Sequence, residues 1–240
     1  MSGHSKWATT KRHKWAVDAK RSNKFTKHAK LIAVAARNGG DPESNSALRL
    51  AVDKARLDNM PNANIERAIK KGTGELKEGN EIQELYYEAY GPGGAALYIQ
   101  VLTDNKNRTA SEIREILKEF EGTLAESGAV SFLFEKKAIF FILLGQVKDK
   151  DALELSLIDL GVSDIETTES ELMIAGDYTL FGTIKDFLEK LQYQIKSSEI
   201  RFVPKASLEV NEKQATILQQ LVEALDANDD VNDVFINVNL

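Results

Sequence analysis

From residue 25 onwards, apolar residues recur at the spacing of a helix, and they do so in three consecutive segments. The first segment carries one apolar stripe, formed by Phe25, Ala29, Ile32, Ala33 and Ala36. Intervals of three and four residues place such side chains on one helix face. The second segment covers 48–55, and the third runs from Pro61 to Gly72. Three short helices joined by short turns predict a small helical bundle.

Beyond residue 80 the pattern changes to that of strands alternating with helices. Strands are predicted at 84–91 and 95–104, joined by a tight turn, then a helix at 109–121 that starts with a Thr109–Glu112 capping box, and a strand at 130–135. The order strand, helix, strand, strand, helix, strand follows over 137–144, 150–160, 162–168, 171–175, 178–192 and 197–203. This is the order of a ferredoxin-like unit. A strand at 206–210, a helix from Asn211 and a last strand at 234–240 complete the chain.

The strands before residue 135 need partners, and the elements after residue 205 would supply them. We therefore predict an α+β fold, in which an N-terminal three-helix head precedes two α+β domains, the second of them ferredoxin-like (βαββαβ) and inserted into the first. The predicted limits are 1–79 for a basic helical head, 80–135 plus 205–240 for a discontinuous α+β domain, and 136–204 for the inserted domain.

Charge is distributed very unevenly along the 240 residues. Residues 1–38 hold ten Lys and Arg residues but only one acidic residue, Asp18, and they also hold all three histidines and both tryptophans. Residues 39–80 carry seven charges of each sign. Because the formal net charge of the whole chain is −6, residues 81–240 carry −15. Such a contrast favours binding to nucleic acid or to another anionic surface through the N-terminal segment.

Lysine and arginine clusters bind phosphate backbones largely without regard to sequence, and aromatic side chains stack on unpaired bases. Each tryptophan taken alone is better explained by packing into the helical core, whereas the ten clustered cations are better explained by binding to an anionic polymer. Arg108, between a strand end and a helix start, is a further candidate for a phosphate contact. The predicted nucleic-acid-binding residues are Lys6, Trp7, Lys11, Arg12, His13, Lys14, Trp15, Lys20, Arg21, Lys24, Lys27, Lys30 and Arg108.

Other chemistries find little support in the residues. The chain has no cysteine, which excludes disulfides and thiolate chemistry and fits a reducing compartment. The three histidines are nine and fifteen residues apart, with few acids nearby, so neither a metal site nor a Ser-His-Asp triad is predicted. Asp104 alone in a turn is a poor magnesium site. We predict no catalytic residues, metal or cofactor.

The apolar runs and the composition of the N-terminal segment bear on the location of the protein in the cell. The longest apolar run, 138–144, has seven residues, far short of the roughly 20 that a membrane span needs. A basic, acid-poor start is typical of organelle transit peptides. Here, however, Lys outnumbers Arg and the segment continues directly into helical sequence. We predict a cytoplasmic protein that does not bind membranes, and leave its oligomeric state open.

Several short motifs together resemble the YebC family. They are GHSKW at the start, then KRHK, DAKR, FTK, AAR-x-GG-DP, NMP, YGPGG and LTDN-x-NRT, which lie within residues 1–135. The resemblance implies a three-domain protein without known catalysis that acts on gene expression through DNA, or through the ribosome and its RNA. Ala89, Glu121 and Ala129 depart from the family pattern, which has Gly, Gly and Ser at these places.

Taken together, these features predict a non-enzymatic nucleic-acid-binding regulator of gene expression, of the DNA-binding transcriptional type. An alternative, implied by the resemblance, is a translation factor that binds ribosomal or messenger RNA on the ribosome and relieves stalling at proline-rich stretches. A further alternative is an adaptor whose ferredoxin-like domain binds a partner protein. A metal-dependent nuclease centred on Asp104 is disfavoured, because no carboxylates cluster around that residue.

Overall fold

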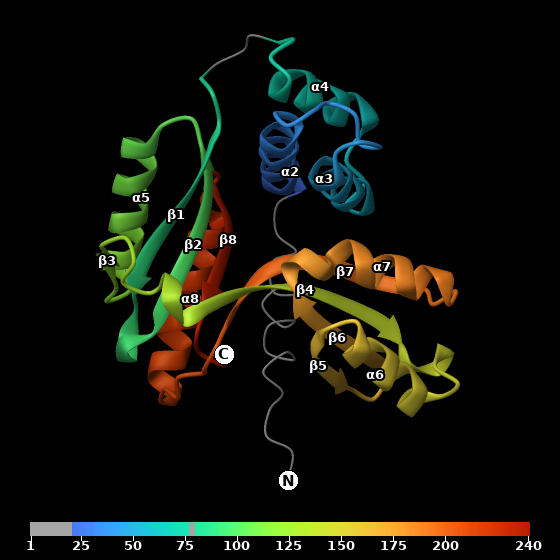
Figure 1. The fold of residues 1–240 in the computed structure, drawn as a ribbon. Helices are drawn as coiled ribbons and strands as arrows, with labels where there is room; N and C mark the ends of the chain where they lie inside the picture. Colours follow the sequence, from blue (N-terminus) through green and yellow to red (C-terminus); the bar gives the residue numbers. More distant parts are fainter. Residues whose placement is uncertain (1–20, 77–79) are drawn as a thin grey trace. The chain divides into compact units, whose positions relative to one another are not determined.

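The computed structural model describes residues 21–76 and 80–240 (Figure 1). The chain divides into two compact units. The first unit combines residues up to 133 with residues 206–240, and the second consists of residues 134–205. The predicted α+β class is confirmed, with three helices followed by a sheet domain into which a second sheet domain is inserted.

The head contains α2 (Arg21–Ala36), α3 (Ser46–Leu57) and α4 (Asn62–Gly72). Its core is the predicted set of apolar stripes, with Ile32, Leu48 and Ile65 almost completely buried. Small residues allow α2 and α4 to approach closely. A Cβ atom added to Gly72 would lie 2.2 Å from the carbonyl oxygen of Ala33.

Asn45 joins two of these helices through one side chain. Its amide nitrogen donates to the carbonyl oxygens of Ala35 and Gly39, both at 2.8 Å, near the end of α2. Its amide oxygen accepts from the backbone N–H of Leu48 at 3.1 Å and so caps the start of α3.

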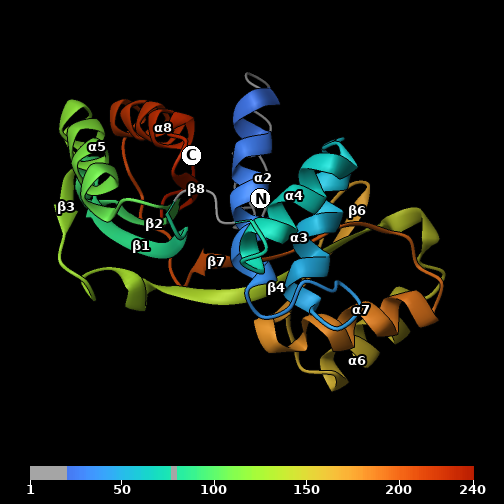
Figure 2. The ribbon, with the colours of Figure 1, turned by 90° about the horizontal axis from the view of Figure 1, so that it is seen from above.

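The first sheet is antiparallel, with strand order β3-β1-β2-β8. The register pairs Tyr87 with Ile99, so the odd-numbered residues of β1 and β2 share one face. This face packs against Ile113 and Leu117 of α5 and Leu221 of α8, and Figure 2 shows both helices on the same side of the sheet. The elements are β1 (Gln83–Tyr90), β2 (Ala96–Thr103), α5 (Lys106–Glu119), β3 (Thr123–Ala125), α8 (Glu212–Ala227) and β8 (Val231–Ile236).

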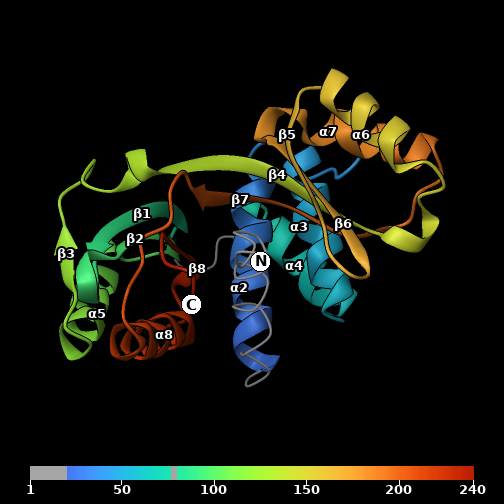
Figure 3. The same cartoon turned by 90° about the horizontal axis from the view of Figure 1, so that it is seen from below.

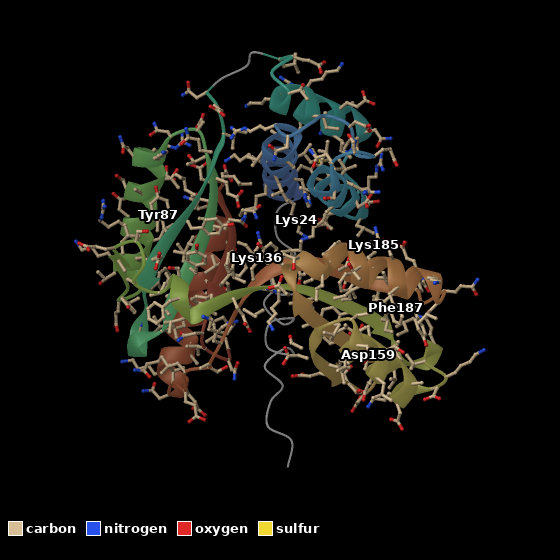
Figure 4. All side chains as sticks on the ribbon, in the orientation of Figure 1. Lys24, Tyr87, Lys136, Asp159, Lys185 and Phe187 are labelled. Atoms are coloured by element: carbon tan, nitrogen blue, oxygen red, sulfur yellow. The ribbon has the colours of Figure 1, made fainter. Side chains whose placement is uncertain are left out.

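The second unit has the strand order β5-β6-β4-β7, which is the order of a ferredoxin-like βαββαβ fold. Both of its helices pack on one face of the sheet, around the fully buried Phe140 (Figure 3). Phe187, labelled in Figure 4, belongs to the same cluster. The elements are β4 (Phe134–Leu143), α6 (Lys150–Asp159), β5 (Val162–Thr167), β6 (Glu171–Asp177), α7 (Phe181–Lys190) and β7 (Ile195–Pro204).

The predicted strand at 130–135 is wrong. Residues Ser131–Leu133 form a short 3₁₀ helix, and Phe134 already begins β4. The carboxylate of the buried Glu88 explains the difference, since it accepts from the backbone N–H groups of Gly128, Val130 and Ser131 at 2.6–2.8 Å. These N–H groups are therefore not available to a neighbouring strand.

Two other local predictions are wrong as well. The predicted strand at 206–210 reduces to a single bridge, between Leu208 and Val238. The helix predicted from Thr109 begins earlier, at Lys106, because the side chain of Asn105 accepts from the N–H of Arg108 at 3.2 Å and caps the helix there. Thr109 is thus an interior, buried residue of α5 and not part of a capping box.

The structure also contains elements that were not predicted. The short strand β3 pairs with the end of β1. The turn between β1 and β2 includes a 3₁₀ helix, Pro92–Gly94, and two more follow β4 and β6, at Leu144–Gln146 and Tyr178–Leu180. Both predicted helix starts at Pro61 and Asn211 are confirmed, the latter with a complete Asn211–Gln214 capping box.

Candidate nucleic-acid interface

Most of the predicted nucleic-acid-binding residues lie outside the part of the chain that the structure describes. These are Lys6, Trp7, Lys11, Arg12, His13, Lys14, Trp15 and Lys20, together with the side chain of Arg21, whose backbone begins α2. Four predicted residues remain, namely Lys24, Lys27, Lys30 and Arg108. Their surroundings differ sharply.

Lys24, Lys27 and Lys30 follow one another at intervals of three along α2. At 100° per residue they form one stripe on the side of the helix opposite to the apolar stripe. Lys24 is exposed on the first turns of α2 (Figure 4), whereas Lys27 and Lys30 are partly buried. The stripe therefore has an open end at the start of α2 and a covered end farther along the helix.

The covered end contacts the last turn of α8 and the turn between α8 and β8. The ammonium group of Lys27 donates to the carbonyl oxygen of Asp226 at 2.7 Å. Lys30 donates to the carbonyl oxygen of Asp229 at 2.8 Å and to the carboxylate of Asp230 at 2.6 Å. Burial lowers the pKa of Lys27, and the nearby carboxylates of Asp226 and Asp233 oppose that shift.

Asp230 is the centre of this contact. Its side chain is 6% exposed. Its carboxylate accepts from Lys30, from Arg108 at 2.7 Å, and from the hydroxyls of Thr109 and Thr103 at 2.7 and 3.1 Å. Burial raises the pKa of this carboxyl group, but the hydrogen bonds from Arg108, Lys30 and Thr109 outweigh burial and hold the pKa far below its ordinary value.

Arg108, predicted as a phosphate contact, is already paired with carboxylates. Besides Asp230, its guanidinium group binds Asp104 at 3.0 Å and approaches Glu112 at 3.8 Å. The hydrogen bonds to Asp230 raise the pKa of Arg108. The motif LTDN-x-NRT therefore has a clear structural role, because three of its side chains, from Thr103, Arg108 and Thr109, hold Asp230 while Asn105 caps α5.

Sequence reasoning missed Asp230. The residue ends the polar run DANDD, which begins in the last turn of α8 and has a composition typical of an exposed loop. Two hydroxyls, Thr103 and Thr109, on either side of a turn were the only local sign that a buried acceptor was needed, and they do not identify a partner more than 100 residues away.

A cleft of about 950 Å³ adjoins this contact within the first unit. Apolar side chains from the head and from the start of the sheet domain line part of it, including Phe25, Met60 and Ile82. Charges of both signs line the remainder, so the cleft as a whole does not favour an anion. These charged residues are Lys30, Arg67, Lys71, Arg108, Asp104, Glu112, Asp229 and Asp230.

The head exposes further cations that the prediction did not include. Arg49, Arg56 and Lys70 are exposed on α3 and α4. His28 instead binds the carboxylate of Asp58 at 2.6 Å within the head. Within residues 21–76 and 80–240, no group of three or more His, Asp or Glu side chains is placed to hold a metal ion.

The three departures from the family pattern lie around Glu88 and the end of α5. Ala89 is fully buried in the first sheet. Ala129 lies in the loop that Glu88 holds, and its carbonyl oxygen accepts from the hydroxyl of Tyr90 at 2.9 Å. Glu121 has φ of +59°, a left-handed conformation that favours glycine. None of the three is near the lysine stripe in sequence, and Glu121 alone has a visible conformational cost.

Comparison with known proteins identifies the family. A model of the TACO1/YebC N-terminal domain matches residues 5–75, and a model of the TACO1/YebC second and third domain matches residues 82–238. A "Probable transcriptional regulatory protein" of Pseudothermotoga lettingae is 48% identical over 241 residues, covering 100% of this chain and 94% of the relative. One of Thermotoga maritima with the same description is 46% identical, with the same coverage.

A solved structure agrees with these relatives. The crystal structure of a conserved hypothetical protein from Aquifex aeolicus matches with a TM-score of 0.80 at 38% sequence identity, over 92% of this chain and 91% of that one. The names of the relatives describe regulators and not enzymes. Within the described residues, no helix is both long and apolar enough to cross a membrane. On the two family models and the full-length relatives, the chain belongs to the TACO1/YebC family.

Proposed function

We propose that this protein is a non-enzymatic regulator of gene expression that binds nucleic acid through its basic N-terminal segment. The observation that carries the proposal is the charge of +9 on residues 1–38 in a chain whose net charge is −6. The family names support regulation of transcription, and duplex DNA is therefore the first target to test.

The described part of the head narrows the choice of contacts. Lys27, Lys30 and Arg108 already have internal oxygen partners, whereas Lys24 is exposed. We therefore assign the main phosphate contacts to the cations that precede α2 and to Lys24. The acidic remainder of the chain, with −15 on residues 81–240, would repel a polyanion and restrict it to this segment.

A salt titration with a labelled 20-base-pair duplex tests the proposal. If about six phosphates are neutralised, the logarithm of the association constant falls with the logarithm of the salt concentration with a slope of roughly −5. Changing Lys11, Arg12 and Lys14 together to Glu removes about three of these contacts, so the slope falls to roughly −3 and binding is nearly abolished at physiological salt.

A matched control separates this effect from net charge. Lys118, Lys190 and Lys213 are exposed and lie far from the N-terminal segment in sequence. Changing all three to Glu alters the net charge equally and is expected to leave binding nearly unchanged. Equal binding by the Lys11, Arg12 and Lys14 variant would refute the proposal. Tighter binding to structured RNA or purified ribosomes than to the duplex would place the regulator at translation instead.

A further inference from the structure

The lysine stripe on α2 is longer than its exposed part. Lys24, Lys27 and Lys30 succeed one another at about 4.5 Å along the helix axis, and in the sequence they follow the cations that precede α2. Only the first of the three is exposed. The other two donate to oxygen atoms of residues 226–230, which we call the acidic turn.

The oxygens of the acidic turn accept hydrogen bonds from these two ammonium groups, as phosphate oxygens would. Both lysines have acceptors at 2.6–2.8 Å, the ordinary distance of a charge-assisted hydrogen bond to a carboxylate or a phosphate. The carboxylates of Asp226, Asp229 and Asp233 add negative potential around Lys27. While the turn holds these lysines, fewer of their N–H donors remain for the phosphates of a nucleic acid, and the nearby carboxylates repel those phosphates.

We propose that the acidic turn competes with nucleic acid for Lys27 and Lys30, so that it limits the polyanion to the start of α2 unless the turn is released. This inference rests on the proposed function and deepens it, because it says which of the cations are held back. Release of the turn adds two phosphate contacts to the interface and loosens the attachment of α2 to residues 226–230. Binding of nucleic acid is thereby coupled to the contact between the head and the first sheet domain.

Neutralising the outer acids of the turn tests the competition without removing the buried Asp230. In Asp226→Asn combined with Asp229→Asn, the potential that holds Lys27 and repels phosphate is reduced, while the hydrogen bonds of Asp230 to Thr103, Thr109 and Arg108 are retained. We expect this variant to bind a labelled 20-base-pair duplex at least about fivefold more tightly than the intact chain. Because Asp230 still holds Lys30, only Lys27 is freed, and the salt slope should become steeper by about 1.

The matched control removes two acids elsewhere in the same unit. Glu115 and Glu119 are exposed on α5, and Glu115→Gln with Glu119→Gln changes the net charge by the same amount. The control is expected to bind within about twofold of the intact chain, because long-range charge is screened over about 8 Å at physiological salt. Equal affinity gains in the two variants would overturn the inference and attribute the gain to net charge.

Lys27→Gln completes a double-mutant cycle. In the intact background it should change affinity little, since Lys27 is occupied, whereas in the Asp226→Asn, Asp229→Asn background it should remove much of the gain. Additive effects would overturn the inference, and thermal melts of all variants verify that they fold. If the intact chain binds neither duplex DNA nor structured RNA nor ribosomes, the proposed function is wrong, and the inference that rests on it is wrong as well. Failure of the proposed function can be told apart from failure of the inference, because it is seen with the intact chain alone, before any variant is measured.

Discussion

Lys24 and Lys30 lie six residues apart, at the two ends of the lysine stripe on α2, and their surroundings differ. Lys24 is exposed at the open end of the stripe. Lys30 has a side chain that is 18% exposed and bonds to Asp230, which is 200 positions away in the sequence. A cluster of cations in the sequence identifies a basic region, but only the folded structure shows which of those cations already have internal oxygen partners.

We therefore expect the cations of the N-terminal region to have two different roles. Cations whose partners are internal contribute to stability, and cations exposed to water are available for binding. Substitutions of Asp230 and its neighbours separate these two contributions.

Asp230→Ala should have the largest effect. It leaves Lys30, Arg108 and the hydroxyls of Thr103 and Thr109 without their common acceptor, and loss of one partner of a buried ionic network costs about 3 kcal/mol or more in the free energy of unfolding. Chemical denaturation measures it. Asp229→Ala, at an exposed neighbour, should cost less than about 0.5 kcal/mol, and equal losses would contradict the central role of Asp230.

The stabilisation from Asp230 should depend on pH. Its pKa in the folded protein is depressed below the unfolded value of about 3.9, so its contribution is present above about pH 4 and is lost as the pH falls towards the folded-state pKa. The difference in unfolding free energy between the intact chain and Asp230→Asn should therefore be constant from pH 7 to 5 and shrink below about pH 4. A difference that stays constant down to pH 3 would contradict the assignment.

Lys30→Met should lower stability by about 1.5 kcal/mol, because Asp230 loses one charged donor but retains Arg108 and the two hydroxyls. Lys24→Met should leave stability within about 0.5 kcal/mol of the intact chain. Nucleic-acid affinity should show the opposite order, with the larger loss in Lys24→Met. Equal effects of the two substitutions on either quantity would abolish the contrast between the two ends of the stripe.

Glu121→Gly should have the smallest effect, and a favourable one. The left-handed backbone at this position costs a non-glycine residue about 1 kcal/mol, and glycine avoids this cost. Glycine also gives the unfolded chain more conformational freedom, which offsets part of the gain. We expect an increase in stability of at most about 1 kcal/mol, with nucleic-acid affinity unchanged. A loss of stability measured by denaturation would show that the Glu121 side chain has a stabilising contact.

The sequence patterns predicted the fold well where the structure of an element depends on its own apolar periodicity. The apolar stripes of α2, α3 and α4 and the order of elements in the second unit were read directly from periodicity, because burial imposes that period. Predictions failed where a distant side chain overrides a local preference. Glu88 holds the backbone at 130–131 from 42 residues away and prevents the strand predicted there.

The same limit applies to the candidate site. The concentration of cations before α2 is visible in the sequence, since it depends only on composition. The pairing of Lys27, Lys30 and Arg108 with the turn after α8 depends on a contact across about 120–200 residues, and no local pattern encodes it. Arg108 looked available for phosphate for this reason.

Removing residues 1–20 tests whether the N-terminal segment binds nucleic acid, and it leaves all described contacts of α2 in place. Duplex, RNA and ribosome binding by the truncated chain should be compared with binding by the intact chain at one salt concentration. We expect affinity for the preferred target to fall at least about a hundredfold while thermal melting changes little. Undiminished affinity in the truncated chain would contradict the claim that this segment binds the polyanion.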